Sequence, residues 1–175
     1  MWRLLRTRLW AAPLCLTFGC DHGLDANVAG QTGIAGRITF EGDWPDNVGQ
    51  VAVAVYEDLP GTLTDLFELS GSDTNVEIGA DSYDYFVPLQ RDGVYRWIVV
   101  AWRRPGAFWD FTSLLGCYQT DGVALPTAVP VIQGEVADGI DIGVDFSRLA
   151  EDRDVLSSAC TAVLPPELVE LARDG

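Results

Sequence analysis

The chain contains no lysine and only one histidine among its 175 residues. Without lysine it has no Schiff-base nucleophile and no phosphate-cradling loop lysine, and no glycine-rich run opens a helix. The histidine, His22, lies in a short polar segment near the N-terminus. A Ser-His-Asp or Cys-His catalytic site therefore lacks a positioned imidazole, and an ordinary zinc site lacks its histidine ligands. These gaps predict that the protein is not an enzyme.

The chain also lacks an apolar run of the roughly 20 residues that cross a bilayer. A shorter apolar run, residues 9–18, follows a basic segment that contains Arg3, Arg6 and Arg8. This order is typical of the leader of an exported protein. The run ends in Leu16-Thr17-Phe18-Gly19-Cys20.

That ending resembles the lipobox of bacterial lipoproteins, in which a small residue directly precedes the lipid-modified cysteine. The resemblance implies a signal peptide over residues 1–19 and attachment of fatty acyl chains such as palmitate to Cys20. Two such anchors would hold the protein at a membrane of the bacterial cell envelope. The alternative is an ordinary signal peptide that is cut nearby and leaves Cys20 as a thiol.

Positive charge is scarce as well. The chain has 11 arginines and 26 acidic residues, which gives a net charge of −15. Cleavage of the leader would remove three arginines but no acidic residue. Such a surface repels phosphate backbones, so we expect no nucleic-acid partner. The acidity is explained by a solvated coat suited to a saline habitat, by a GC-rich genome that favours arginine, or by binding of divalent cations.

Carboxylate pairs are the remaining chemical candidates. Asp81 and Asp84 could supply the hard oxygen ligands that Ca²⁺ prefers, and a solvated turn is the alternative. Paired carboxylates can also hydrolyse glycosides. Close pairs arise by chance in so acidic a chain, which ranks a hydrolase third among the hypotheses.

Four cysteines are present. Cys15 lies in the leader and Cys20 is the predicted lipid site, so Cys117 and Cys160 remain. In an oxidising compartment these two should form a disulfide.

The patterns divide the chain into a tether over residues 20–32, one domain over 33–147 and a helical tail over 148–175 that packs on the domain. Alternating apolar residues over 34–41 and 140–146 predict strands with one buried face. Residues 51–56 and 94–103 are apolar on both faces and predict interior strands. Asp92-Gly93 favours a hairpin between strands 83–89 and 94–103.

This order of patterns, with Gly36-x-Ile38-x-Phe40, Asp92-Gly93-x-Tyr95 and Gly139-Ile140-Asp141-Ile142, is similar to a transthyretin-like sandwich. That fold occurs in carboxypeptidase regulatory-like domains and in repeats of surface proteins. The resemblance covers residues 33–147. It implies an all-β, antiparallel β-sandwich of about seven strands that serves as an accessory or surface module.

A long loop is expected over residues 105–125 and contains Phe108, Trp109 and Phe111. These rings either cap the sandwich core or form an exposed platform for a sugar or a protein. The function hypothesis is a non-enzymatic envelope lipoprotein whose domain binds an envelope protein. The alternative is a surface module that binds a glycan or Ca²⁺.

Overall fold

The computed structural model describes residues 30–109, 114–120, 125–147, 160 and 163–173. Within them it contains ten strand segments and one α-helix, arranged as an all-β sandwich, which confirms the predicted fold class. The proposed leader, Cys20, residues 21–29 of the tether, Phe111 and residues 148–159 of the tail lie outside the described part. The described end of the tether is joined to the domain, because the Thr32 carbonyl accepts a hydrogen bond from the Leu89 amide at 2.8 Å.

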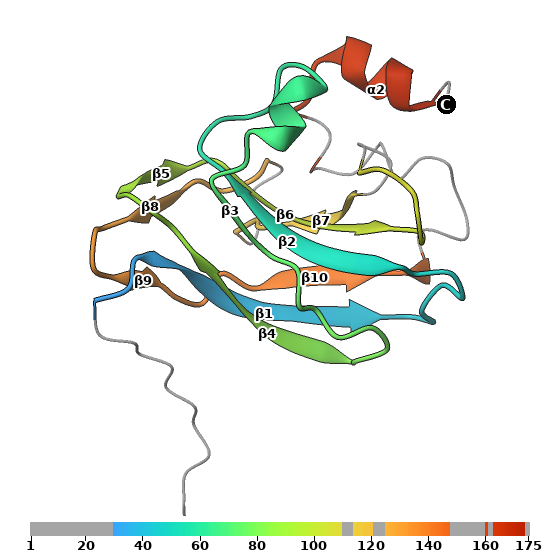
Figure 1. Cartoon of the computed structure of the whole chain (residues 1–175), viewed down its shortest axis with the longest axis horizontal. Coiled ribbons are helices and arrows are strands. Elements are labelled where there is room, and N and C mark those ends of the chain that lie inside the picture. The colour runs from blue at the N-terminus through green and yellow to red at the C-terminus, as the bar shows by residue number, and fades with distance from the viewer. Residues whose placement is uncertain (1–29, 110–113, 121–124, 148–159, 161–162, 174–175) are drawn as a thin grey trace, which may run out of the picture.

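Sheet A forms the lower layer in Figure 1. Its strands are β4 (Ser82–Pro88), β1 (Gly33–Glu41), β10 (Ile142–Asp145) and the short β9 (Val136–Ala137). Strand β1 runs antiparallel to β4 but parallel to β10 and β9. The sheet is therefore mixed rather than wholly antiparallel.

Sheet B forms the upper layer, in the order β3 (Gly71–Asp73), β2 (Gln50–Tyr56), β6 (Trp97–Arg103) and β7 (Leu114–Cys117). All of its neighbouring strands are antiparallel. Strands β2 and β6 are the two interior strands, as their two-sided apolar patterns predict. Strand β7 lies within the segment expected to be a loop, since its four residues are too few to show an alternating pattern.

The main core lies between the two sheets. It is built mainly from aliphatic side chains that alternate along the strands. The aromatic side chains of Tyr85, Tyr95 and Phe146 are also part of it. Along one side, Gly116 of β7 packs against the backbone of β10, and an added Cβ would lie 2.8 Å from the Gly143 carbonyl oxygen. A glycine is required there because it lets the edges of the two sheets meet.

The predicted hairpin is wrong. Strand β4 pairs with β1 in sheet A, whereas β6 pairs with β2 and β7 in sheet B. Between them, β5 (Gly93–Tyr95) pairs with β8 (Val129–Val131) in a small third sheet. Gly93 is not among the glycines with positive φ, so Asp92-Gly93 does not form the turn that a two-residue hairpin needs. The segment instead carries the chain from one sheet to the other.

The predicted disulfide and helical tail are confirmed where the structure describes them. Cys117 and Cys160 form a disulfide with their Cα atoms 5.5 Å apart. Helix α2 (Pro166–Arg173) begins at the expected proline, and Leu168 is buried against the sandwich. No helix in the described ranges is long and apolar enough to cross a membrane.

Candidate functional site

The outer face of sheet B carries a second apolar layer. Because side chains alternate along a strand, each interior strand sends one set inward and the other outward. The inward set joins the main core, and the outward set consists of Ala52, Ala54 and Tyr56 from β2 and Trp97, Val99 and Ala101 from β6. An outer sheet face of this kind must be covered to be stable in water.

The described residues cover only part of this face. An apolar hollow of about 120 Å³ remains over β2 and β6, and we call it the sheet B groove. Its lining residues are Ala52, Ala54, Tyr56, Leu66, Phe67, Leu69, Ser72, Thr74, Trp97, Val99, Ala101, Trp109 and Leu114. The hollow exists because three of the outward positions are alanine, whose small side chains leave space between the larger tyrosine, tryptophan and leucine side chains of the lining. Ala52 and Ala101 face each other across the two strands.

One wall of the groove is the 3₁₀ helix η1 (Thr64–Phe67). The Tyr56 hydroxyl donates a hydrogen bond to the Leu66 carbonyl oxygen at 2.8 Å and so ties η1 to the sheet. Burial of this hydroxyl raises the pKa of Tyr56 to about 12. Asp65 holds the preceding turn, because its carboxylate accepts from the Thr62 hydroxyl and from the Gly61 amide. These two bonds lower the pKa of Asp65.

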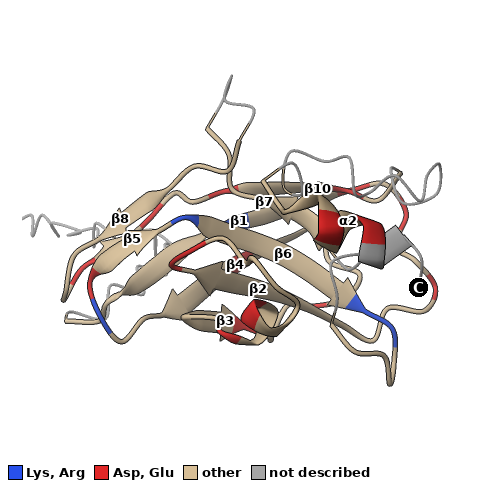
Figure 2. Cartoon of the chain, turned by 90° about the horizontal axis from the view of Figure 1, so that it is seen from above, with Lys and Arg blue, Asp and Glu red and all other residues tan. Residues whose placement is uncertain are grey.

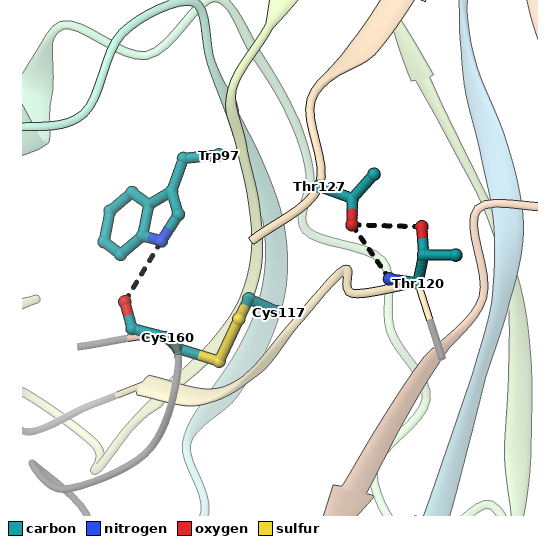
Figure 3. Close-up of a disulfide and its surroundings, with 5 residues drawn as sticks. All are labelled: Trp97, Cys117, Thr120, Thr127 and Cys160. Carbon is teal, nitrogen blue, oxygen red and sulfur yellow. Dashed lines mark hydrogen bonds between the residues drawn. A yellow bond between two sulfur atoms is a disulfide. The ribbon is translucent and has the colours of Figure 1, made fainter. Parts of the chain in front are cut away.

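A second boundary is the C-terminal segment. The disulfide holds Cys160 at β7, and the Trp97 indole N–H donates to the Cys160 carbonyl oxygen at 3.3 Å (Figure 3). Beyond Cys160, Leu164 and Leu168 pack in the same cluster as Trp97. The C-terminal segment thus closes one end of the outer face and leaves the groove beside it.

The start of the long loop that follows β6 forms the third wall. Trp109 lines the groove and lies 5.4 Å from the Arg103 guanidinium, measured to its ring centroid. Arg103 in turn donates to the Gln50 side chain and to the Ala107 carbonyl oxygen, which fixes the start of the loop. Phe108 is 87% exposed, so it does not cap the core. Of the three predicted binding rings, Trp109 lines the groove, Phe108 is exposed on the residue before it, and Phe111 lies outside the described residues.

The predicted calcium ligands do not form a comparable site. Asp84 binds Arg37 across the strand pair β1–β4, with Arg37 Nε 2.6 Å from the carboxylate. This hydrogen bond lowers the pKa of Asp84. Across the described ranges, no group of three or more His, Cys, Asp or Glu side chains could hold a metal ion.

Sequence reasoning missed η1 and Phe67 as parts of the site. Phe67 is 66% exposed and lines the groove. The two-sided apolar patterns of residues 51–56 and 97–103 were the available signal, because they show that both faces of these strands are covered. What covers the outer face depends on tertiary packing that no local pattern records.

No known protein family, no curated protein and no solved structure matches the chain.

Proposed function

We propose that the chain is a non-enzymatic lipoprotein of the bacterial cell envelope, anchored through Cys20, whose sandwich binds a partner protein in the sheet B groove. The observation that carries the proposal is an apolar hollow whose lining includes Trp109 and the 66% exposed Phe67. Phe108, which precedes Trp109 in the chain, is 87% exposed. Large aromatic side chains next to an apolar pocket are characteristic of protein interfaces.

The construction of the groove supports binding rather than core packing alone. Each of its boundaries is fixed by a specific bond: Tyr56 to Leu66, Trp97 to Cys160, and Arg103 to Ala107. A rigid groove loses little conformational entropy when a partner binds, which favours affinity.

The position of the groove also agrees with an anchored protein. The chain enters the domain at β1, in sheet A, whereas the groove lies on the outer face of sheet B (Figure 1). A partner in the groove would approach from the side opposite the entry of the chain. The sandwich architecture agrees as well with the accessory role that the predicted transthyretin-like similarity implies.

The apolar lining favours a protein over a glycan as ligand. Ser72 and Thr74 are the polar side chains among the lining residues. A sugar needs several convergent hydrogen-bonding groups for orientation and specificity. A protein segment that inserts an apolar side chain needs few such hydrogen-bonding groups.

Site-specific photocrosslinking tests the interaction. A photoreactive phenylalanine analogue replaces Phe67 in cells of the native host, and a parallel strain carries it at Ile132, which is 61% exposed in the turn between β8 and β9. We expect a discrete protein adduct from position 67 that position 132 does not give. Equal patterns from both positions, or none from position 67, would refute the interaction.

Cell fractionation tests the anchor. The substitution Cys20→Ala removes the only sulfur at the predicted lipobox, so the variant should leave the membrane fraction and fail to incorporate labelled fatty acid. Cys15→Ala, in the leader, is the matched control and should behave like the wild type. A membrane-bound, labelled Cys20→Ala protein would contradict the proposal.

A further inference from the structure

We infer that the occupant of the sheet B groove is a segment of a partner protein that carries one large apolar side chain flanked by lysine or arginine. The inference rests on the proposed function and specifies the chemistry of its ligand. It follows from the size of the groove and from the charges around it.

The size of the groove sets the number of anchors. A cavity of about 150 Å³ holds one benzene ring, and the sheet B groove measures about 120 Å³. It therefore accommodates one leucine-sized or phenyl-sized side chain. The floor of Ala52, Ala54 and Ala101 and the adjoining rings give that side chain an apolar contact on several sides.

The charge around the groove is negative. Glu68 directly follows the groove residue Phe67, and Glu167 and Glu170 lie on α2, whose Leu168 packs with Trp97 and Leu114. All three glutamates are exposed. Seen from above in Figure 2, α2 presents acidic residues at the side of β6 and β7.

These glutamates are free to interact with a ligand. The described residues contain three ion pairs, Arg37–Asp84, Arg91–Glu57 and Arg96–Asp58, and none of them uses a glutamate of the rim. Arg103, which contacts the groove residue Trp109, donates to two neutral acceptors, Gln50 and the Ala107 carbonyl oxygen, and so keeps its positive charge. The three glutamates outnumber this one cation. A ligand with basic residues beside its anchor would complement this rim.

The same charges disfavour two other occupants. A second copy of this chain would bring like-charged rims together, in a protein whose net charge is −15. A bilayer with anionic lipids would be repelled in the same way. A basic protein segment is the occupant that satisfies both the apolar floor and the acidic rim.

Peptide selection on the purified full chain tests this chemistry. A phage library of random twelve-residue peptides is panned on the immobilised protein at low ionic strength. We expect the enriched peptides to share one Phe, Leu or Met with Lys or Arg within a few positions. The best peptide is then synthesised, labelled and measured by fluorescence anisotropy.

Two sets of variants locate the peptide. Ala54→Leu/Ala101→Leu fills the hollow and should weaken binding at least tenfold. Glu68→Gln/Glu167→Gln/Glu170→Gln should weaken it about tenfold at low salt, as three partly screened charge pairs would, and should reduce its salt dependence.

The matched controls lie at the other end of the sandwich. Ile132→Ala and Glu135→Gln remove an exposed apolar and an exposed acidic side chain from the turn between β8 and β9, and neither should change the affinity. Circular dichroism and the midpoint of urea unfolding establish that each variant is folded.

Several results would overturn the inference. Selection of peptides without basic residues would do so, as would affinities that the two sets of variants leave unchanged. Self-association of the free chain that the groove-filling variant abolishes would point to a second copy as the occupant. Binding to vesicles of anionic lipid through the groove would point to a membrane. If an adduct forms at Phe67 in cells while selection yields neutral or acidic peptides, only the inference fails. If no adduct forms, the proposed function fails.

Discussion

Removing the disulfide should cost the domain a large part of its stability. The substitution is Cys117→Ala/Cys160→Ala. Alanine is preferable to serine because both positions are buried, at 7% and 4% exposure, and a buried hydroxyl without a partner is costly.

The magnitude follows from the length of chain that the bond closes. The two cysteines are 43 residues apart in sequence. For a loop of that length, the chain-entropy estimate gives about 4 kcal/mol of stabilisation through restriction of the unfolded state. Domains of this size are commonly stable by about 5–15 kcal/mol. The variant should therefore remain folded at 25 °C with a clearly lower midpoint of unfolding.

Urea unfolding followed by far-ultraviolet circular dichroism measures the loss. Tryptophan fluorescence gives a second signal that combines both faces of sheet B. Trp97 is fully buried on the outer face and donates to Cys160, whereas Trp44 and Trp102 pack against the main core. Wild-type protein unfolded in the presence of a reductant is the control and should match the variant.

A free energy of unfolding within about 1 kcal/mol of the oxidised wild type would refute the reasoning, because the chain-entropy term would then be largely absent. So would a reduced wild type that stays as stable as the oxidised protein. Either result would mean that packing of the C-terminal segment, and not the covalent bond, holds this face closed.

Four further substitutions test other contacts by urea unfolding. Tyr56→Phe removes one buried hydrogen bond and should cost about 1 kcal/mol at neutral pH. Because the folded-state pKa of Tyr56 is raised from 10.0 to about 12, the wild type should lose stability as the pH rises through that window, and the variant should lose less. Arg37→Ala should change stability by no more than about 0.5 kcal/mol, since its ion pair with Asp84 is exposed on both sides. Gly36→Ala should cost about 1–3 kcal/mol because its Cβ would collide with backbone, whereas Gly143→Ala meets open space and should lose far less. A costly Arg37→Ala, or equal losses for the two glycine variants, would contradict the packing described.

Local patterns predicted the strands of the sandwich well. Residues 34–41 alternate because one face of β1 is buried in the core, and residues 51–56 are apolar throughout because β2 is covered on both faces. Which strands pair with each other was harder to predict from the sequence. Asp92-Gly93 favours a tight hairpin, but strand 83–89 finds its partner in β1, and packing between sheets overrides the preference of the turn.

The candidate site shows the same division. Trp109 and Phe108 could be proposed from the sequence because aromatic residues gather in one loop. The groove could not, since it depends on alanines at three outward positions of two strands that lie side by side only in the folded sheet. The spacing of Leu63, Leu66, Phe67 and Leu69 is compatible with one helical turn or an irregular loop at the sheet edge, and the structure has the turn as η1. That Phe67 lines a groove depends on how η1 packs on sheet B.

The parallel contact of β1 with β10 has a consequence for how the domain is made. Residue 38 pairs with residue 142, so the first of the described strands can complete its pairing only after the last of them has been synthesised. Until then, one side of β1 presents bare amide and carbonyl groups that can join to any other extended chain. A nascent or truncated polypeptide that ends before residue 142 is thus an aggregation-prone species.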